Sequence, residues 1–445
     1  MQEVKETIEQ RIKSVVGKFL ETPQERDIQI ISHFDTDGIT SAAIMIKTLK
    51  KLDKKFSVKI VKSLEKDFIY SMSKNKITLF LDLGSGSINH ILESGLKDVF
   101  IIDHHEIIQE PPEEISIINP ELHNKQKISS SGLTYLFSKE INPDNKELSK
   151  LAVLGMIGDT LESEIGKLNN GILEDGEIKR KRGLLIYPST RPLNRTLEYC
   201  LNPYIPGVTG NIEGTRELLR EVGLGPINKK YKSLIELNEQ EMEKIVTAIL
   251  LRAPQAKNNK IIGDIFLIKL YNKLEDAREL SAKINACSRF GKSSIAIQFC
   301  MEIQDAKKKI ETIHAKYKQM IISSLKFVSE AEKINGKDFL IINARDQIKD
   351  TMIGTIASIM SKSSMYQEGT IITTMAYYDD KIKVSSRSVG KNCRNVREVL
   401  NSVIEKIGGE IGGHDCAAGC IIKQEKEQEF IDLLKKNLEI EMVKI

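Results

Sequence analysis

The sequence predicts an α/β protein: a mostly parallel N-terminal sheet, a helical insert, and a second α/β domain reached through a long helix. From residue 27 to about 159, short β-branched runs alternate with helix-patterned stretches, which is typical of a parallel sheet. Residues 161–253 lose this strand pattern and are punctuated by Pro and Gly. We therefore expect domains at residues 1–165, 166–300 (the largely helical insert), 301–335 (the connecting helix) and 336–445.

Individual elements follow from the same patterns. Crossovers between parallel strands need helices, and residues 38–52 and 87–94 have helical patterns. Apolar residues spaced by three to five positions between Ile303 and Leu325 form one stripe, which predicts the connecting helix. The expected strands are residues 28–32, 56–61, 77–81 and 99–102 in the first domain, and 339–342, 371–375, 382–386 and 419–422 in the last.

Composition excludes several classes of protein. The chain has 445 residues, 40% of them hydrophobic and 29% charged, and no apolar run approaches the length of a membrane span. Residues 1–10 alternate acidic and basic side chains, unlike a secretory signal. Six cysteines form no CxxC pair, which indicates reduced thiols. We expect a soluble, cytoplasmic protein without a membrane partner, and a net charge of +4 does not by itself indicate a polyanionic ligand.

The segment from His33 to Gly38, HFDTDG, follows an apolar strand and precedes a helix. Its imidazole and carboxylates should therefore lie at the carboxyl end of a strand, where open α/β sheets bind ligands. Asp35 and Asp37 would repel each other in one tight turn unless a cation neutralised them. Taken alone, an Asx turn with a helix N-cap explains this segment equally well.

Similar residues recur at three other element ends. Asp82 follows residues 78–81, Asp103-His104-His105 follows residues 99–102, and Asp159 follows the apolar stretch 151–158. One such carboxylate is usually a cap, but four sets converging at one sheet edge would make an oxygen-and-imidazole metal site. Manganese suits these ligands, with magnesium as a substitute. A two-metal hydrolase needs such a set, including a carboxylate that the two ions share.

Two segments of the last domain fit phosphate. Residues 408–419 are rich in glycine, which lets backbone amides approach a phosphate closely, although a flexible turn is the simpler explanation in isolation. Ser385-Ser386-Arg387-Ser388 ends a predicted strand. The planar guanidinium of Arg387 suits bidentate phosphate binding.

Together, HxDxDG, a lone strand-end Asp, DHH and the later Asp resemble the four motifs of the DHH phosphoesterase family. The resemblance implies that His33 and Asp35 hold one metal ion, and that Asp37 and His104 hold the other. Asp82 would bridge the two ions and also be catalytic.

The same resemblance implies that Asp159 completes the metal shell. It further implies that His105 is catalytic and faces the scissile phosphate as an electrophile or proton donor. GGHxxAAG, which contains Gly412, Gly413 and His414, resembles the substrate-binding loop of the DHH-associated domain.

Further segments resemble RecJ-type nucleases, and in particular the archaeal RecJ-like exonucleases. Residues 285–289 resemble NAxGR, with Ser288 in place of the usual Gly, and Ser385 and Arg387 resemble an SxRS element. In those nucleases the positions of Arg289, Ser385 and Arg387 would form a terminal-phosphate pocket, which favours exonuclease action. Residues 189–193 and 202–211 resemble the archaeal insert, which implies a GINS-type replisome partner.

Residues 179–182, KRKR, form a compact basic run. Such a run can contact a nucleic-acid backbone, but a solvated turn explains it equally well.

The leading hypothesis is metal-dependent hydrolysis of single-stranded nucleic acid from a chain end, 5′ to 3′ on DNA and also on RNA, in DNA replication or repair. One alternative is a small-nucleotide DHH phosphodiesterase or phosphatase of the oligoribonuclease type, although its relatives usually lack such an insert. Another is a non-catalytic replisome subunit of the same fold. Retention of Asp35, Asp37, Asp82, His104 and Asp159 argues against this last alternative, because clustered unpaired carboxylates cost stability.

Overall fold

The computed structural model describes residues 6–107, 109–123, 125–163, 165–200, 203, 205–254, 261–363, 365–390 and 394–439. Asn202, Tyr204 and Cys393, which belong to segments discussed above, lie outside these residues. The chain divides into two compact units. The first unit comprises Met1–Arg191, Ser233–Glu236 and Ile262–His314; the second comprises Pro192–Lys232, Leu237–Ile261 and Ala315–Ile445.

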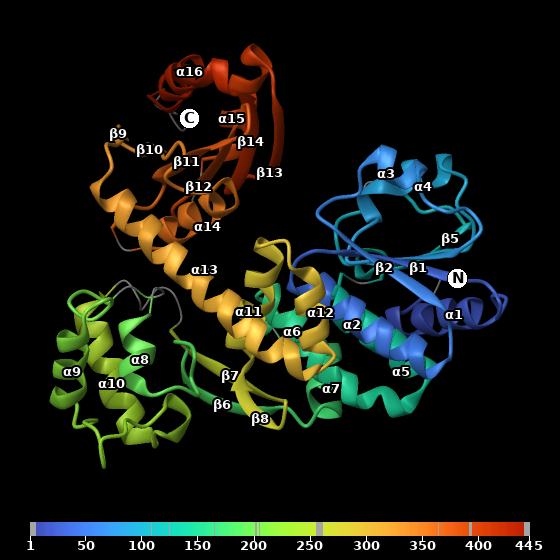
Figure 1. Ribbon diagram of the computed structural model, residues 1–445, viewed down its shortest axis with the longest axis horizontal. Helices are drawn as coiled ribbons and strands as arrows, with labels where there is room; N and C mark the ends of the chain where they lie inside the picture. Colours follow the sequence, from blue (N-terminus) through green and yellow to red (C-terminus); the bar gives the residue numbers. More distant parts are fainter. Residues whose placement is uncertain are drawn as a thin grey trace, which may run out of the picture. The chain divides into compact units, whose positions relative to one another are not determined.

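A five-stranded parallel sheet forms the centre of the first unit (Figure 1). Its strand order is β2-β1-β3-β4-β5, and every neighbouring pair is parallel. The strands are β1 (Ile28–His33), β2 (Phe56–Val61), β3 (Ile77–Leu81), β4 (Val99–Ile102) and β5 (Ile115–Ile118). Four of the five were predicted; β5 follows Pro111-Pro112-Glu113-Glu114, which obscured its short apolar run.

Helices cover both faces of this sheet because alternate strand residues point to opposite sides. On one face, Ile31 and Phe80 pack with α3 (Lys66–Tyr70) and α4 (Ile88–Glu93). On the other, Ile30 and Leu79 belong to a larger core. The helices of that core include α1 (Ile8–Leu20), α2 (Thr36–Lys51), α5 (Ser130–Ile141) and α6 (Ser149–Gly158).

Residues 166–300 were expected to be largely helical, and beside their helices the structure has an antiparallel sheet. The sheet has the order β6-β7-β8, with strands β6 (Lys179–Leu184), β7 (Ile262–Leu270) and β8 (Lys273–Asp276). The basic run 179–182 is therefore a strand and not a solvated turn. Its position at a sheet edge, where charged side chains reach solvent, explains why it lacked the apolar alternation of a strand.

The remaining elements of this region are helical. The first unit contains α7 (Lys167–Asp175), α11 (Ala277–Arg289) and α12 (Ser293–Cys300). The second unit contains α8 (Leu193–Glu198), α9 (Ile212–Glu221) and α10 (Glu239–Arg252). The predicted connecting helix is α13 (Gln304–Glu330), which begins in the first unit and ends in the second.

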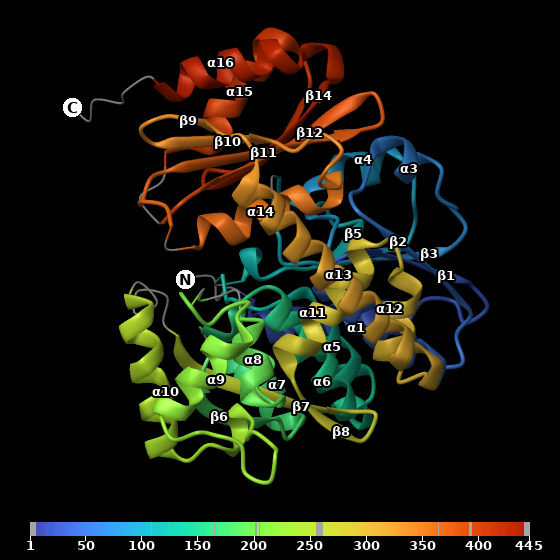
Figure 2. The same ribbon diagram turned by 60° about the vertical axis from the view of Figure 1, so that its left-hand side comes forward.

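The last domain is a six-stranded mixed sheet of order β13-β14-β12-β11-β10-β9. Figure 2 shows α15 (Val396–Ile407) and α16 (Glu427–Glu439) over one face and α14 (Asp350–Ser361) over the other. The strands are β9 (Ile334–Asn335), β10 (Phe339–Asn343), β11 (Ile371–Tyr378), β12 (Lys381–Ser388), β13 (Glu410–His414) and β14 (Ala417–Lys423). Of these, β10, β11, β12 and β14 correspond to the predicted strands.

The glycine-rich segment near the C-terminus is a β-hairpin arm and not the flexible turn that the sequence pattern in isolation favoured. Residues of β13 pair with β14, and Gly412 lies opposite Gly419. Gly413 has a φ of +119°, and a Cβ there would lie 2.5 Å from the Ala417 carbonyl oxygen. Glycine thus permits the close approach of the two strands, which residue-by-residue turn propensity does not predict.

The cysteines differ in state. Cys200, Cys287, Cys300 and Cys420 are buried free thiols, as predicted. Cys416 is disulfide-bonded, so the expectation of a fully reduced set was wrong. In the described part of the chain, no helix combines the length and the apolar composition needed to cross a bilayer.

Candidate metal centre and phosphate-binding residues

The carboxyl ends of β1, β3 and β4 bring three of the predicted motifs to one edge of the sheet. His33 ends β1, Asp82 directly follows β3, and Asp103-His104-His105 follows β4. The chain runs from β1 to β2 on one side and from β3 to β4 on the other, so the connections that leave these neighbouring strands at this edge run in opposite directions. This is the point at which doubly wound sheets bind ligands.

Asp35 both caps a helix and faces the metal-ligand cluster. Its Oδ1 accepts a hydrogen bond from the Gly38 backbone N–H of α2 at 3.0 Å, and its Oδ2 lies 3.0 Å from His33 Nδ1. The N-cap and metal-ligand explanations are therefore compatible. Burial raises the pKa of Asp35, but the hydrogen bond from His33 outweighs this effect and lowers the pKa to about 2. Gly38 permits the turn, since a Cβ there would lie 2.3 Å from the His33 carbonyl oxygen.

Asp37 is fully buried in the first turn of α2. It accepts hydrogen bonds from the backbone N–H groups of Ser130 (2.6 Å) and Ser131 (3.0 Å), at the beginning of α5. A Cβ at residue 155 would lie 2.0 Å from Ser131 Oγ and 2.2 Å from Asp37 Oδ1, so only glycine fits there. Gly155 and this amide pair fix the Asp37 carboxylate, and neither was predicted from sequence.

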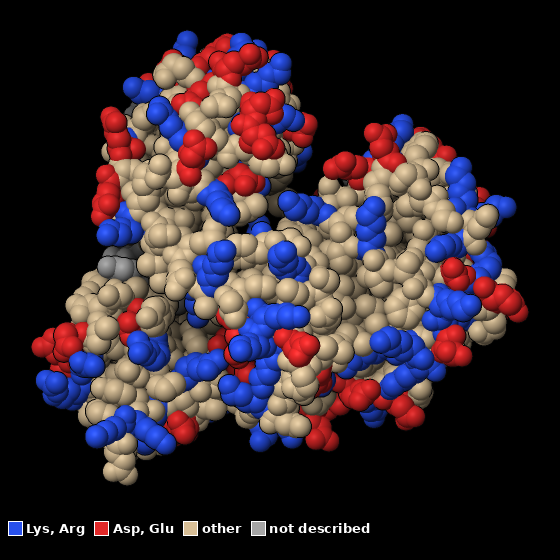
Figure 3. Space-filling model, in the orientation of Figure 1, with Lys and Arg blue, Asp and Glu red and all other residues tan. Residues whose placement is uncertain are grey.

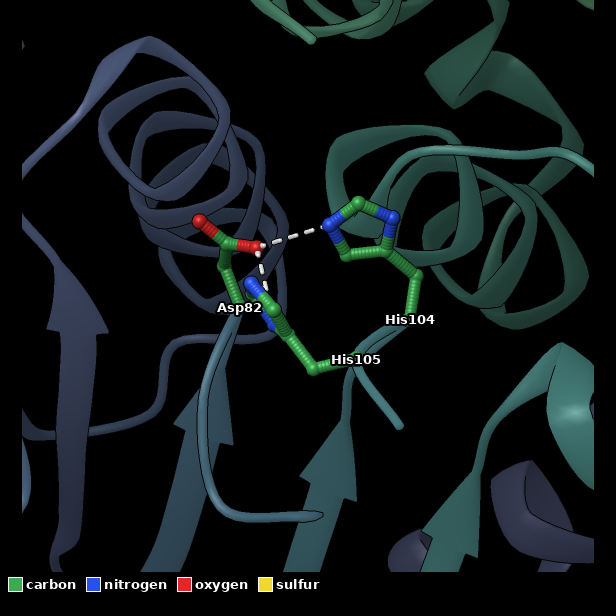
Figure 4. Close-up of side chains that lie close together, drawn as sticks. All are labelled: Asp82, His104 and His105. Atoms are coloured by element: carbon green, nitrogen blue, oxygen red, sulfur yellow. Dashed lines mark ion pairs between the residues drawn. The ribbon is translucent and has the colours of Figure 1, made fainter. Parts of the chain in front are cut away.

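Asp82 lies at the centre of the cluster and is 1% exposed. Its φ of +60° turns the chain sharply at the end of β3. One oxygen, Oδ2, is 3.2 Å from His33 Nδ1, and the other, Oδ1, is 3.5 Å from His104 Nε2. Figure 4 shows the imidazoles of His104 and His105 directed at the same Asp82 oxygen. The two carboxylate oxygens thus face two different sets of side chains, as a bridging ligand requires.

Two buried carboxylate oxygens of the cluster lack hydrogen-bond partners among the described residues: Asp82 Oδ1 and Asp159 Oδ2. His104 Nε2 lies 3.5 Å from each of them. Burial, and then the neighbouring carboxylates beginning with Asp37, raise the pKa of Asp82 well above its usual range. The same causes raise the pKa of Asp159 to about 11. Buried, mutually repelling carboxylates without partners fit a site built for cations.

The ligand atoms form groups whose members lie within 4.8 Å of one another. One group is His33, Asp35 and Asp82, and a second is Asp37, His104 and Asp159. These two groups correspond to the division between two ions that the family resemblance implied, with Asp82 Oδ1 turned toward the second group.

A third group joins Asp82, His104 and His105. His105 Nδ1 is engaged elsewhere, however, since it lies 2.7 Å from Asp103 Oδ1. The buried Asp103 carboxylate also accepts hydrogen bonds from the backbone N–H groups of Ser85, His104 and His105. Burial raises the pKa of Asp103, but the hydrogen bond from the His105 side chain, followed by that from Ser85, lowers it below its ordinary value. The hydrogen bond to Asp103 raises the pKa of His105.

Asp103 is therefore an orienting group that the sequence reading did not single out. Asn119 supports it by donating hydrogen bonds to Ser85 Oγ and to the His105 carbonyl oxygen, both at 2.9 Å. Asp103 was noted in sequence as part of the DHH motif, but its orienting role was not, because the groups that fix this arrangement, Ser85 and Asn119, come from the segments after β3 and β5.

The second unit brings together the predicted phosphate-binding residues of the last domain. Ser385 and Arg387 lie on the same side of β12, and pairing through β14 aligns Ser385 with Gly412 and Arg387 with His414. Arg387 Nε donates to Ser358 Oγ at 3.1 Å, and Nη1 donates to the carbonyl oxygens of Ser386 (2.8 Å) and Ala418 (3.3 Å). The guanidinium is thus oriented by the protein itself.

Arg289 belongs to the first unit, at the end of α11, and its guanidinium carbon lies 5.8 Å from the centre of the Phe34 ring. A separate cavity of about 470 Å³ in the first unit is lined by Gln126, Lys127 and residues 165–169. None of the predicted site residues lines this cavity.

Three family matches agree with the geometry. Residues 27–158 match the DHH family, N-terminal domain; residues 186–261 match the DHH-CID domain; and residues 336–439 match the DHHA1 domain. The chain belongs to the DHH superfamily. All the candidate metal ligands except Asp159 fall within the first match. All the predicted phosphate-binding residues except Arg289 fall within the last match. The predicted domain boundaries remain predictions.

Two relatives are similar to this chain in sequence. An uncharacterised protein of Methanocaldococcus jannaschii is 29% identical over 446 residues, covering 97% of both chains. The single-stranded-DNA-specific exonuclease RecJ of Thermus thermophilus is 26% identical over 171 residues, covering 34% of this chain and 25% of that protein.

Solved structures show a RecJ-like fold. Exonuclease RecJ bound to manganese superposes with a TM-score of 0.61 at 16% identity, covering 97% of this chain and 95% of that chain. CDC45 from Entamoeba histolytica superposes with a TM-score of 0.66 at 10% identity, covering 96% of this chain and 99% of that chain. RecJ of Thermus thermophilus in complex with Mg²⁺ superposes with a TM-score of 0.56 at 15% identity, covering 97% of this chain and 53% of that chain.

Proposed function

We propose that this DHH protein is a two-metal phosphodiesterase that removes nucleotides from an end of single-stranded nucleic acid, 5′ to 3′ on DNA and also on RNA. The observation that carries the proposal is the pair of ligand groups around Asp82, with two buried carboxylate oxygens that lack partners among the described residues. A folded protein retains such a cluster at a cost in stability, which a cation-dependent activity would explain.

His33, Asp35 and Asp82 would hold one divalent cation, and Asp37, His104 and Asp159 the other. When bound, two such ions supply an activated water and polarise a phosphoryl oxygen. Manganese is the preferred metal and magnesium a possible one, since RecJ structures carry each of them and carboxylate with imidazole suits Mn²⁺.

His105 would act on the phosphate without holding a metal. Its Nδ1 donates to Asp103, so the opposite ring nitrogen is left to face the substrate. The raised pKa of His105 favours the imidazolium form, in which that nitrogen carries a proton and can donate it to a phosphoryl or leaving-group oxygen.

The phosphates of the strand would be held by Arg289, Ser385, Arg387 and the glycine-rich arm with Gly412, Gly413 and His414. Figure 3 shows basic and acidic side chains interspersed over the visible face, in keeping with a net charge of +4. Phosphate binding would therefore depend on these few local groups and not on the overall charge of the protein. Gripping a terminal phosphate would restrict cleavage to chain ends, in DNA replication or repair.

A second candidate function is a replisome subunit, which the similarity in fold to CDC45 favours. A GINS-type partner would then bind this protein. The two functions are compatible if the protein cleaves while bound to such a partner. The complete set of metal-ligand candidates favours catalysis over a purely structural role.

The test is incubation of the purified chain with Mn²⁺ and end-labelled single-stranded DNA and RNA, beside an Asp82→Ala variant, followed by a denaturing gel. We expect stepwise release of mononucleotides by the wild type and none by the variant. Intact strands with the wild type would contradict the proposal. Hydrolysis of dinucleotides alone would instead support the small-nucleotide phosphodiesterase.

A further inference from the structure

The metal-binding turn has two alternating sets of side chains. His33, Asp35 and Asp37 are metal-ligand candidates, whereas Phe34 and Thr36 lie between them and contact α11. Thr36 Oγ1 donates a hydrogen bond to the Ser281 carbonyl oxygen at 3.2 Å, and Arg289 approaches the Phe34 ring. Ser281 and Arg289 are eight residues apart, so both face the turn from one side of the helix.

The Phe34 ring lies between a metal-ligand candidate and an arginine. Its centroid is 4.9 Å from that of the His33 imidazole, with the two rings nearly perpendicular at 88°. The Arg289 guanidinium carbon is 5.8 Å from the Phe34 centroid. Phe34 is only half-buried, unlike the fully buried aromatic residues of the core such as Phe80 and Phe137. Its position is therefore not explained by core packing alone.

Arg289 is exposed, and in the described part of the chain its guanidinium makes no hydrogen bond or ion pair. Arg387, by contrast, donates to three oxygens of its own domain. Contact with an aromatic face holds a guanidinium through electrostatic attraction and leaves its N–H groups free in the guanidinium plane. The Phe34 contact is thus the one that can restrict Arg289 while keeping its donors available.

We propose that Phe34 is a positioning residue that holds the Arg289 guanidinium beside the metal centre, where its N–H donors bind the terminal phosphate of a nucleic-acid strand. This inference rests on the proposed function for its substrate. Phe34 neither holds a metal ion nor touches the phosphate; it determines whether an otherwise unanchored arginine is in place when the strand end arrives.

Thr36 provides a matched control from the same turn. Its hydroxyl contacts the Ser281 backbone eight residues before Arg289, and Gly158 makes room for this contact because a Cβ there would lie 2.8 Å from Thr36 Cβ. Thr36→Val removes that hydrogen bond and the longer one that Thr36 Oγ1 accepts from Ser281 Oγ at 3.5 Å, and it leaves the side chains of Phe34 and Arg289 unchanged. It perturbs the packing of α11 without altering the aromatic contact.

The experiment measures the dissociation constants of two 12-nucleotide single strands, one with a 5′-phosphate and one with a 5′-hydroxyl, for the full chain with Mn²⁺. We expect wild type to prefer the phosphorylated strand. Phe34→Leu should weaken binding of the phosphorylated strand about 3- to 10-fold, the range of one partly exposed cation–π contact. Binding of the hydroxyl strand and of Mn²⁺ should not change, and Phe34→Tyr and Thr36→Val should keep the preference.

A double variant separates positioning from general disruption. In an Arg289→Ala background, Phe34→Leu should have no further effect on the phosphorylated strand, because its effect acts through the arginine. Three results would overturn the inference. Phe34→Leu could weaken binding of both strands equally, it could weaken binding of the phosphorylated strand even in the Arg289→Ala background, or the wild type could bind both strands with the same affinity. Preferential binding without strand cleavage would contradict the proposed function and leave this inference standing.

Discussion

The predicted phosphate-binding residues of the second unit and the candidate metal ligands of the first unit differ in whether their polar atoms have partners within the protein. In the second unit, Arg387 donates hydrogen bonds to Ser358, Ser386 and Ala418, so its geometry is complete without a ligand. In the first unit, Asp82 and Asp159 each keep a buried oxygen without a partner among the described residues, and their pKa values are raised. We infer from this difference that the candidate metal centre would lower stability until cations bind, whereas Arg387 would carry no such cost.

The largest effect is expected for Asp82→Asn. Nuclease activity should fall by about 1000-fold or more, because bound metals supply several kcal/mol and each 1.4 kcal/mol is about tenfold in rate. The metal-free variant should nevertheless be more stable than wild type, by about 1–3 kcal/mol, because asparagine is neutral without binding a proton, whereas the buried Asp82 carboxyl must either stay protonated or bear a charge beside Asp37. Thermal unfolding in chelator measures the second effect. A destabilised variant would show that the cluster is satisfied without cations.

Arg387→Ala should have the next largest effect, about 10- to 100-fold in kcat/KM and mainly through KM, because charge-assisted phosphate contacts are worth about 1.5–3 kcal/mol. Mn²⁺ affinity should be unchanged. Steady-state kinetics, with wild type and Arg387→Lys as controls, measure the loss in kcat/KM. Lysine should restore only part of the activity, since it lacks the planar guanidinium group. Full rescue by lysine would mean that only charge matters there.

Asp103→Asn should reduce activity about 10-fold or somewhat more, as is usual when a group that orients a site residue is changed. Asp103 holds His105 Nδ1 at 2.7 Å, and asparagine cannot hold the imidazolium as a carboxylate does. The loss should lie in kcat, with Mn²⁺ affinity preserved, because Asp103 contacts no metal-ligand side chain. Loss of metal binding would instead assign His105 to the metal shell.

The smallest predicted effect is on the pH dependence of metal stabilisation. Asp159, with a pKa of about 11 in the metal-free protein, is protonated at pH 6–8, so metal binding must displace its proton. Raising the pH makes that displacement easier and lowers metal-free stability, because the unfolded carboxyl is already ionised. Mn²⁺ should therefore raise Tm more at pH 8 than at pH 6, by about 2 °C per pH unit. Equal shifts would contradict the raised pKa.

Much of the fold could be predicted because apolar periodicity is local. β1 to β4 were predicted within a residue of their observed bounds, since each is a short β-branched run with clear limits. β6 and β13 were missed, because a basic edge strand and a glycine-rich edge strand lack apolar alternation. Their pairing depends on partners far along the chain, Ile262–Leu270 for β6 and Ala417–Lys423 for β13.

The candidate metal ligands could be recognised from element ends, but not the groups that orient them. His33, Asp82 and His104 stand out because polar residues follow apolar strands. The backbone amides of Ser130 and Ser131, which hold Asp37 from 93 and 94 residues away, have no sequence signature. Such contacts arise only when α5 packs beside α2.

We propose that two metal ions share the Asp82 carboxylate. Anomalous diffraction from crystals grown with Mn²⁺ tests it most directly. We predict two peaks about 3.5–4 Å apart, one bounded by His33, Asp35 and Asp82 and the other by Asp37, His104, Asp159 and Asp82. A single peak, no peak, or a manganese ion held by His105 would contradict the account.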